Sequence, residues 1–269
     1  TPTQIIQSKL IIPDPLSPED WQLNEQTVAL LRDLSEREIL AEIVSGEALP
    51  TVTLTDGPLE MFRDPQEGRF FQDKFTKYLE SLAKVASTKG IPAGYVVKPG
   101  SDQTARLLEL TQLSTDEYKC AGKPEILAGV IDADLFQVIL APGERSAVFK
   151  LQSTTSERYR SFQENLGVCF FYLNTGFMGN PSLARIEIPT WVAEKQDWVE
   201  LLHTVLVHQC KILGNKPYPY ALHRSHEIAL VRQEEKDQVL AMIIRELNRQ
   251  KLELGSISSK QAMKDATRT

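Results

Sequence analysis

The sequence has 269 residues and a mass of 30.3 kDa, so it can bury a sizeable core, and one domain is the default expectation for an α/β chain of this length. Hydrophobic residues make up 42% and charged residues 25%, which excludes a disordered or fibrous protein. The formal net charge of −6 argues against a protein that coats nucleic acid non-specifically, because that mode depends on many Lys and Arg contacts to phosphate.

The sequence also lacks a run of about 18 to 20 apolar residues and a basic leader, so we expect a cytoplasmic protein without a membrane span. Cys120, Cys169 and Cys210 are widely spaced and odd in number, which favours buried thiols over disulfides or a zinc cluster. An acidic balance remains compatible with a metal-dependent enzyme, because bound divalent ions restore positive charge among the carboxylates that hold them.

The first half of the chain alternates predicted helices and strands. A helix is predicted over 18–45, opened by Ser17-Pro18-Glu19-Asp20. The β-branched run Thr51–Thr55 then ends at Asp56-Gly57-Pro58, which is typical of a buried strand that ends in a turn. A helix over 70–88, a strand over 91–97 and a helix over 104–113 follow. This order favours a mixed or parallel sheet flanked by helices, with ligand sites at the carboxyl ends of strands.

The second half is predicted to extend the sheet and then to become helical. Strand-like runs occupy 148–151, 168–174 and 184–191, and helices are predicted over 196–213 and 222–254. The small, polar and basic segment 255–269 is expected to be a loosely ordered tail. No repeat or interdomain linker is evident, so we expect a single domain over 1–269 with its core at about 30–254.

Asp56 and His226 are the first candidates for chemistry. An Asp-Gly pair after a strand is most often a simple turn in which the glycine takes positive φ, but an Asp at a strand end can also bind a metal ion. His226 lies near the start of the last predicted helix, where a histidine is usually a packed or surface residue and is also a common metal ligand. In the same segment, Tyr218 is interpreted as an aromatic anchor and Arg224 as a residue that could meet phosphate.

Further candidates are charged residues on or beside these elements. Glu187 alternates with apolar neighbours, so it lies on a solvated sheet face, forms a cross-strand pair in the neighbourhood of Arg185, or supports a site. Glu36 and Glu38 precede the Asp56 strand, and either could complete a carboxylate pair while the other stays on a solvated helix face. Asp132 is either a helix N-cap or a supporting residue, and Arg145 is either a surface arginine or a DNA contact.

Other catalytic chemistries are not supported, because the sequence contains no GxGxxG, Walker A, HExxH or GxSxG motif. Several weak motifs, taken in order, instead resemble the NurA family. They cover roughly 30–265 and are Asp56–Leu59, Gly94–Pro99, Asp132–Phe136, Gly143–Ser146, Phe170–Asn174, Arg185–Pro189 and Tyr218-Pro219 with His226.

This resemblance implies an RNase H-like core in one NurA-like nuclease domain that forms a homodimer. It also implies Mn²⁺- or Mg²⁺-dependent cleavage of DNA in break repair, endonucleolytic on single strands and exonucleolytic from 5′ ends. The partner that it implies is a HerA-type hexameric translocase. Two-metal chemistry would then use carboxylates to hold both ions.

Residue by residue, the resemblance assigns Asp56 to the family's second acidic motif, His226 to its late histidine, and Glu36 or Glu38 to its helical acid. The family's first acidic motif, Asp-Gly-Ser, is absent, so it is expected upstream of Thr1 unless this chain departs from the pattern. Val97 stands where the family often carries an Asp. The alternatives are a catalytically impaired scaffold that partners a DNA translocase, and a phosphoesterase acting on small molecules.

Overall fold

The computed structural model describes residues 25–61, 68–111 and 126–249. The chain divides into two units, Thr1–Arg224 and Ser225–Thr269, and the expected single domain stays a prediction. Within the described ranges, no helix is both long and apolar enough to cross a bilayer.

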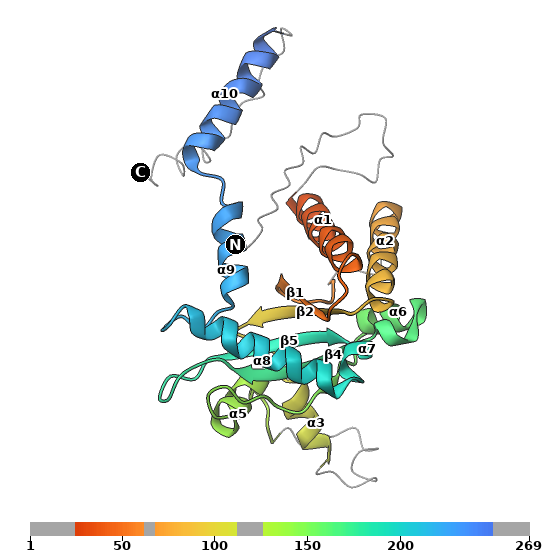
Figure 1. The fold of residues 1–269 in the computed structure, drawn as a ribbon, viewed down its shortest axis with the longest axis vertical. Coiled ribbons are helices and arrows are strands. Elements are labelled where there is room, and N and C mark those ends of the chain that lie inside the picture. Colours follow the sequence, from red (N-terminus) through yellow and green to blue (C-terminus); the bar gives the residue numbers. More distant parts are fainter. Residues whose placement is uncertain (1–24, 62–67, 112–125, 250–269) are drawn as a thin grey trace. The chain divides into compact units, whose positions relative to one another are not determined.

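The first unit is built on a five-stranded mixed sheet in the order β1-β2-β5-β4-β3 (Figure 1). β1 and β2 are parallel, and the other neighbouring pairs are antiparallel. The strands are β1 (Thr51–Asp56), β2 (Gly90–Val97), β3 (Phe149–Lys150), β4 (Val168–Asn174) and β5 (Leu183–Pro189). β4 is buried along its whole length, which explains its continuous apolar sequence, because helices cover both faces of the sheet there.

Helices occupy the two faces of this sheet. They are α1 (Glu25–Ser45), α2 (Arg69–Ala86), α3 (Gln103–Thr111), α5 (Asp132–Ile139), α6 (Thr154–Phe162), the 3-10 turn η1 (Glu164–Leu166), α7 (Thr190–Ala193) and α8 (Gln196–Ile212). On one face, Phe136 of α5 stacks on Tyr172 of β4 with ring centroids 4.8 Å apart. On the other face, Cys210 Sγ of α8 lies 3.8 Å from the Tyr95 hydroxyl of β2.

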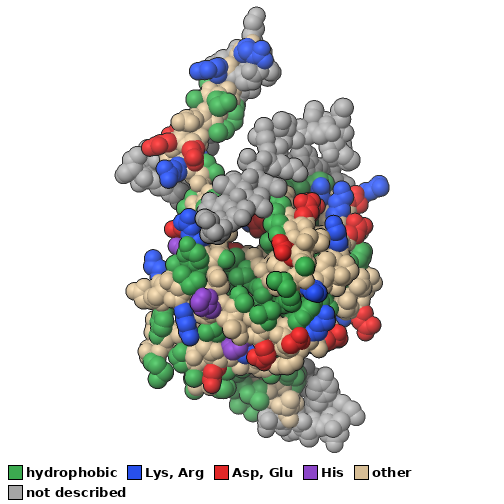
Figure 2. All heavy atoms as spheres, in the orientation of Figure 1, with side chains coloured by type: hydrophobic (Ala, Val, Ile, Leu, Met, Phe, Trp, Pro, Cys, Tyr) green, Lys and Arg blue, Asp and Glu red, His purple; other side chains and the backbone are tan. Residues whose placement is uncertain are grey.

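The amphipathic pattern of α2 shows how a helix packs against the hydrophobic core. Its buried residues recur every three or four positions from Phe71 to Val85, so one stripe of the helix faces the core. α1 and α2 lie side by side above β1 (Figure 1), and Leu30, Leu34, Ala41 and Val44 of α1 are buried. Basic, acidic and hydrophobic side chains are interspersed on the face that Figure 2 shows.

The second unit contains the end of α9 (Tyr220–Ala229) and the whole of α10 (Gln233–Arg249). The prediction of one helix over 222–254 is therefore wrong, because the helix is interrupted at 230–232. A side-chain cap marks the restart, since the backbone N–H of Arg232 donates to Glu235 Oε2 at 2.8 Å. Residues 250–254 and the expected tail over 255–269 lie outside the described residues.

The other element predictions are confirmed within a few residues, and the mixed sheet flanked by helices is confirmed. Residues 18–24 of the first predicted helix and 112–113 of the third lie outside the described residues. The predicted strand over 184–191 ends at Pro189, because α7 begins at Thr190. The short helices α5 and α6 were not predicted.

Candidate functional site at the carboxyl ends of β1 and β2

Asp56 is the last residue of β1 and is exposed, as the strand-and-turn pattern predicted. Because β1 and β2 are parallel, Asp56 lies at the same edge of the sheet as the end of β2. Gly57 follows with φ of 101° and donates its backbone N–H to the Tyr95 carbonyl at 2.9 Å. The chain therefore turns sharply after Asp56 while its carboxylate stays open to solvent.

Tyr218 lies beside Asp56. Its ring packs edge-on against Tyr95, the register partner of Asp56, with centroids 5.5 Å apart. Burial raises the pKa of Tyr218, and the negative charge of Asp56 and a hydrogen bond to its carboxylate raise this pKa further. The aromatic anchor predicted from sequence thus brings a hydroxyl donor to the Asp56 carboxylate.

Glu36 reaches the same region from α1. Burial raises the pKa of Glu36, Arg32 opposes this shift, and the charge of Asp56 is among the smaller contributions that raise it. Glu36 also lies 3.8 Å from Arg32 in an ion pair. Glu36 and Glu38 are both exposed residues of α1, and the charge of Asp56 acts on Glu36.

Arg37 connects α1 to the segment after Asp56. Its guanidinium donates to the Pro58 carbonyl at 2.9 Å and lies over the Tyr78 ring at 5.1 Å. Tyr78 in turn donates its hydroxyl to the Leu59 carbonyl at 3.0 Å. Both contacts fix the backbone that leads away from the Asp56 turn.

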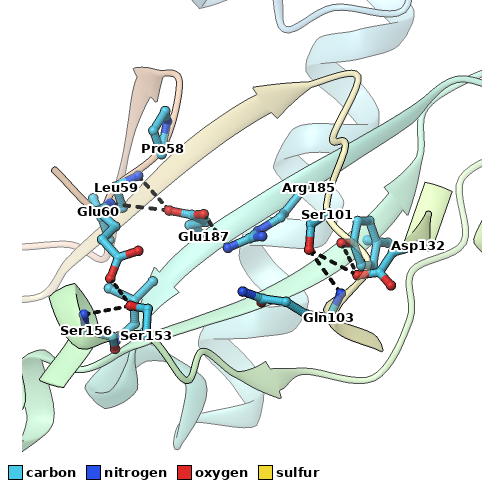
Figure 3. A network of polar contacts seen from close by, with 12 residues as sticks. Pro58, Leu59, Glu60, Ser101, Gln103, Asp132, Ser153, Ser156, Arg185 and Glu187 are labelled. Carbon is cyan, nitrogen blue, oxygen red and sulfur yellow. Dashed lines mark hydrogen bonds and ion pairs between the residues drawn. The ribbon is translucent and has the colours of Figure 1, made fainter. Parts of the chain in front are cut away.

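Glu187 lies in the core on β5, with 1% of its surface exposed. Its Oε1 pairs with Arg185 at 2.7 Å, and its Oε2 accepts the backbone N–H groups of Leu59 at 2.9 Å and Glu60 at 3.3 Å (Figure 3). The interpretation of a solvated sheet face is therefore wrong. The expected cross-strand pair is not found either, because Glu187 pairs with Arg185, two residues earlier on the same face of β5.

Glu60 is a second buried carboxylate in this network, and sequence patterns gave no sign of it. It is 1% exposed, and its Oε1 accepts the hydroxyl of Ser153 at 2.6 Å, while its Oε2 is buried without a hydrogen-bond partner (Figure 3). Burial raises the pKa of Glu60; the Ser153 hydrogen bond opposes this, and the charge of Glu187 adds to it.

Asp132 is fully buried and binds another helix. It is the first residue of α5, whose N-cap is Ile131, so the N-cap interpretation is wrong for its own helix. Its carboxylate accepts the backbone N–H groups of Thr104 at 3.0 Å and Ala105 at 2.7 Å, and the hydroxyl of Tyr172 at 2.7 Å. It therefore caps the start of α3.

Arg145 lies beyond β4, so β2, β5 and β4 separate its segment from Asp56. Its guanidinium pairs with Glu200 of α8 at 2.7 Å and donates to the Ser146 carbonyl at 2.9 Å. The structure does not bring Arg145 to the Asp56 region. Its proposed contact with DNA stays a prediction.

Arg224 and His226 are both exposed residues of α9. Arg224 is the last residue of the first unit, and His226 belongs to the second unit. Their roles in DNA binding and metal binding stay predictions.

Lys98 is a candidate that sequence patterns missed. It directly follows β2, is exposed, and has a φ of 50°, which makes it the one non-glycine residue with positive φ in the described ranges. Such a backbone conformation costs about 1–3 kcal/mol and tends to occur at functional sites. An ammonium group at this edge of the sheet could meet a phosphate.

Asp56 and Glu36 are oxygen donors of the kind that Mg²⁺ and Mn²⁺ prefer. Within the described residues, no group of three or more His, Cys, Asp or Glu side chains is placed to hold a metal ion. Mg²⁺ is commonly held by one or two carboxylates and keeps several waters, so the exposed carboxylate of Asp56 could hold such an ion together with water or phosphate oxygens.

Comparisons with known proteins agree with this architecture. The fold is similar to the crystal structure of the NurA nuclease from Sulfolobus solfataricus, with a TM-score of 0.51 and 11% sequence identity over 84% of this chain and 69% of that one. No curated protein sequence matches. At this identity, the likeness between structures shows the fold alone. The model of the NurA domain matches residues 3–231, which is most of the sequence, and the chain therefore belongs to the NurA domain family.

Proposed function

We propose that this protein is a divalent-metal-dependent nuclease that hydrolyses DNA phosphodiester bonds. The observation that carries the proposal is the exposed carboxylate of Asp56 at the carboxyl ends of two parallel strands, beside the ring of Tyr218. Ligand sites of open α/β sheets lie at this edge. Membership of the NurA family, and the fold shared with a protein described as a nuclease, support the same activity.

Asp56 and Glu36 would hold the metal ion, because both are oxygen ligands and each disfavours the other's negative charge without a cation between them. A bound divalent ion would polarise the scissile phosphate and stabilise the charge that develops on it. The hydroxyl of Tyr218 donates to Asp56 and so orients that carboxylate. Lys98, at the same edge, would attract the DNA backbone.

The finer activities belong to this proposal as well. They are cleavage within single strands, digestion from 5′ ends, an RNase H-like core, Mn²⁺ or Mg²⁺ as the metal with a second ion, and His226 as a metal ligand or as the group that transfers the proton. A homodimer and a HerA-type translocase are the proposed partners in processing broken DNA. The family resemblance supports these points.

The direct test is cleavage of labelled single-stranded DNA in the presence and absence of Mn²⁺. We expect wild type to cut only with metal, Asp56→Asn to lose about 100-fold or more in rate, and Glu36→Gln to lose more than Glu38→Gln. The control is Glu80→Gln, which removes an exposed carboxylate from α2. Equal rates for wild type and Asp56→Asn would overturn the site assignment.

The second candidate function is a scaffold of nuclease fold that partners a DNA translocase without cutting. The observation that favours it is that, among the described residues, no group of three or more His, Cys, Asp or Glu side chains could hold a metal ion. Calorimetric titration with Mn²⁺ separates the two functions. Binding that Asp56→Asn abolishes supports the nuclease, and absence of binding to the wild type supports the scaffold.

A further inference from the structure

We infer that Glu187, held by Arg185, is a positioning residue for Asp56, an inference that rests on the proposed function of that site. The two oxygens of Glu187 have separate partners. One binds the Arg185 guanidinium at 2.7 Å, and the other accepts two successive backbone N–H groups at 2.9 and 3.3 Å. These N–H groups belong to Leu59 and Glu60, three and four residues after Asp56.

The segment that Glu187 binds is the backbone that follows Asp56, and it does not run out past the edge of the sheet. It folds back over β2, so that a Cβ built on Gly94 would lie 2.5 Å from the Leu59 nitrogen and 2.8 Å from the Gly57 oxygen. Gly94 is the register partner of both Thr55 and Glu187. The segment therefore crosses β2 where that strand has no side chain, and it meets the Glu187 carboxylate on the adjacent strand.

This segment is also bound at other points. Arg37 donates to the Pro58 carbonyl and Tyr78 to the Leu59 carbonyl, while Tyr159 accepts the Met61 N–H at 2.9 Å. These partners come from α1, α2 and α6. Glu187 differs from them because its side chain belongs to β5, the middle strand of the sheet, and so it ties the turn after Asp56 to the sheet itself.

A charged acceptor suits this task. Hydrogen bonds from backbone N–H groups to a carboxylate are shorter and about twice as strong as those to a neutral oxygen. Burying Glu187 is costly unless its charge is paired, and Arg185, which is 7% exposed and lies over the Phe170 ring at 4.3 Å, supplies that pairing. Apolar residues could fill the same space, but they could not hold two N–H groups of the turn.

The test compares Glu187→Gln with Glu109→Gln. Glu109 is a matched control because it is also buried, pairs with an arginine, Arg106, and accepts a backbone N–H, that of Leu127 at 3.3 Å. The readouts are amide hydrogen exchange at Leu59 and Glu60, Mn²⁺ affinity by calorimetry, and the rate of DNA cleavage.

We expect Glu187→Gln to speed exchange at Leu59 and Glu60 by roughly 10- to 100-fold, and to weaken Mn²⁺ affinity and slow cleavage by at least about 10-fold. Glu109→Gln should leave all three within about twofold of wild type. Unchanged exchange at both amides in folded Glu187→Gln would overturn the inference, as would faster exchange with unchanged Mn²⁺ affinity and cleavage.

The exchange measurement keeps this inference separate from the proposed function. If the wild type neither binds Mn²⁺ nor cuts DNA, both the proposed function and the inference are overturned, because Asp56 then has no site for Glu187 to position. If the wild type binds Mn²⁺ and cuts DNA but Glu187→Gln does not change the readouts as expected, only the inference is overturned. If Glu187→Gln does not fold, Glu187→Asp keeps the charge and draws the carboxylate back by one methylene. It should change the three readouts in the same direction.

Discussion

Gly94→Ala places a methyl group where the backbone after Asp56 crosses β2. The added Cβ would lie 2.5 Å from the Leu59 nitrogen, whereas ordinary contacts begin near 3.4 Å, so the two backbones must separate by about 0.9 Å. The neighbouring atoms are backbone atoms, which cannot rotate away as a side chain would. We therefore expect the turn that carries Asp56 to move.

The magnitude follows from this displacement. Overpacking of a tight core contact costs about 1–3 kcal/mol, which lowers the melting temperature by about 2–4 °C for each kcal/mol in a domain of this size. Misplacing a reacting group by about 1 Å costs roughly 100-fold in rate. Gly94→Ala should therefore remain folded and lose most of its Mn²⁺-dependent cleavage.

The assay is calorimetric unfolding together with cleavage of single-stranded DNA. Gly46→Ala is the control, because its Cβ would meet the Ile43 carbonyl oxygen at an ordinary 3.6 Å and it lies after α1, before β1 begins. If Gly94→Ala kept the stability and the cleavage rate of the wild type, the close approach of the Leu59 backbone to Gly94 would have no consequence for the site, and this prediction would be wrong.

Tyr218→Phe keeps the ring against Tyr95 and removes the hydroxyl that donates to Asp56. The rate of cleavage should therefore fall by about 10-fold or more, with little change in melting temperature. An unchanged rate would count against this hydrogen bond. Burial raises the pKa of Glu60 in the folded state. The carboxyl group therefore stabilises the fold at pH values below its ordinary pKa, near 4.5, and this stabilisation is lost as the pH rises through the raised pKa of the folded state. Glu60→Gln should therefore gain stability relative to wild type between about pH 4.5 and neutral pH, as measured by urea unfolding, and a constant difference across this range would contradict the assignment.

The fold was predictable where one physical signal dominated. The apolar run of β4 and the stripe of α2 predicted their elements closely, because burial alone determines both patterns. The interruption between α9 and α10 was not predictable from periodicity. It contains neither glycine nor proline, and the cap formed by Glu235 is a single side-chain contact.

The site was predictable in part. A strand that ends in Asp-Gly placed Asp56 at the sheet edge. Tyr218, interpreted from sequence as an aromatic anchor, packs in the structure against Tyr95, the register partner of Asp56. Glu187 was misread because alternating apolar and charged residues look the same whether the charged face meets water or a buried ion pair. Which of Glu36 and Glu38 approaches Asp56 depends on the rotation of α1, and tertiary packing fixes that rotation.

We propose that Asp56 and Glu36 hold a divalent ion at the carboxyl ends of β1 and β2. Anomalous scattering from crystals soaked in Mn²⁺ locates such an ion itself. We expect an anomalous peak within bonding distance of the Asp56 carboxylate, about 2 Å, and we expect it to be absent in Asp56→Asn. A well-occupied Mn²⁺ peak elsewhere in the protein with none at Asp56 would contradict it.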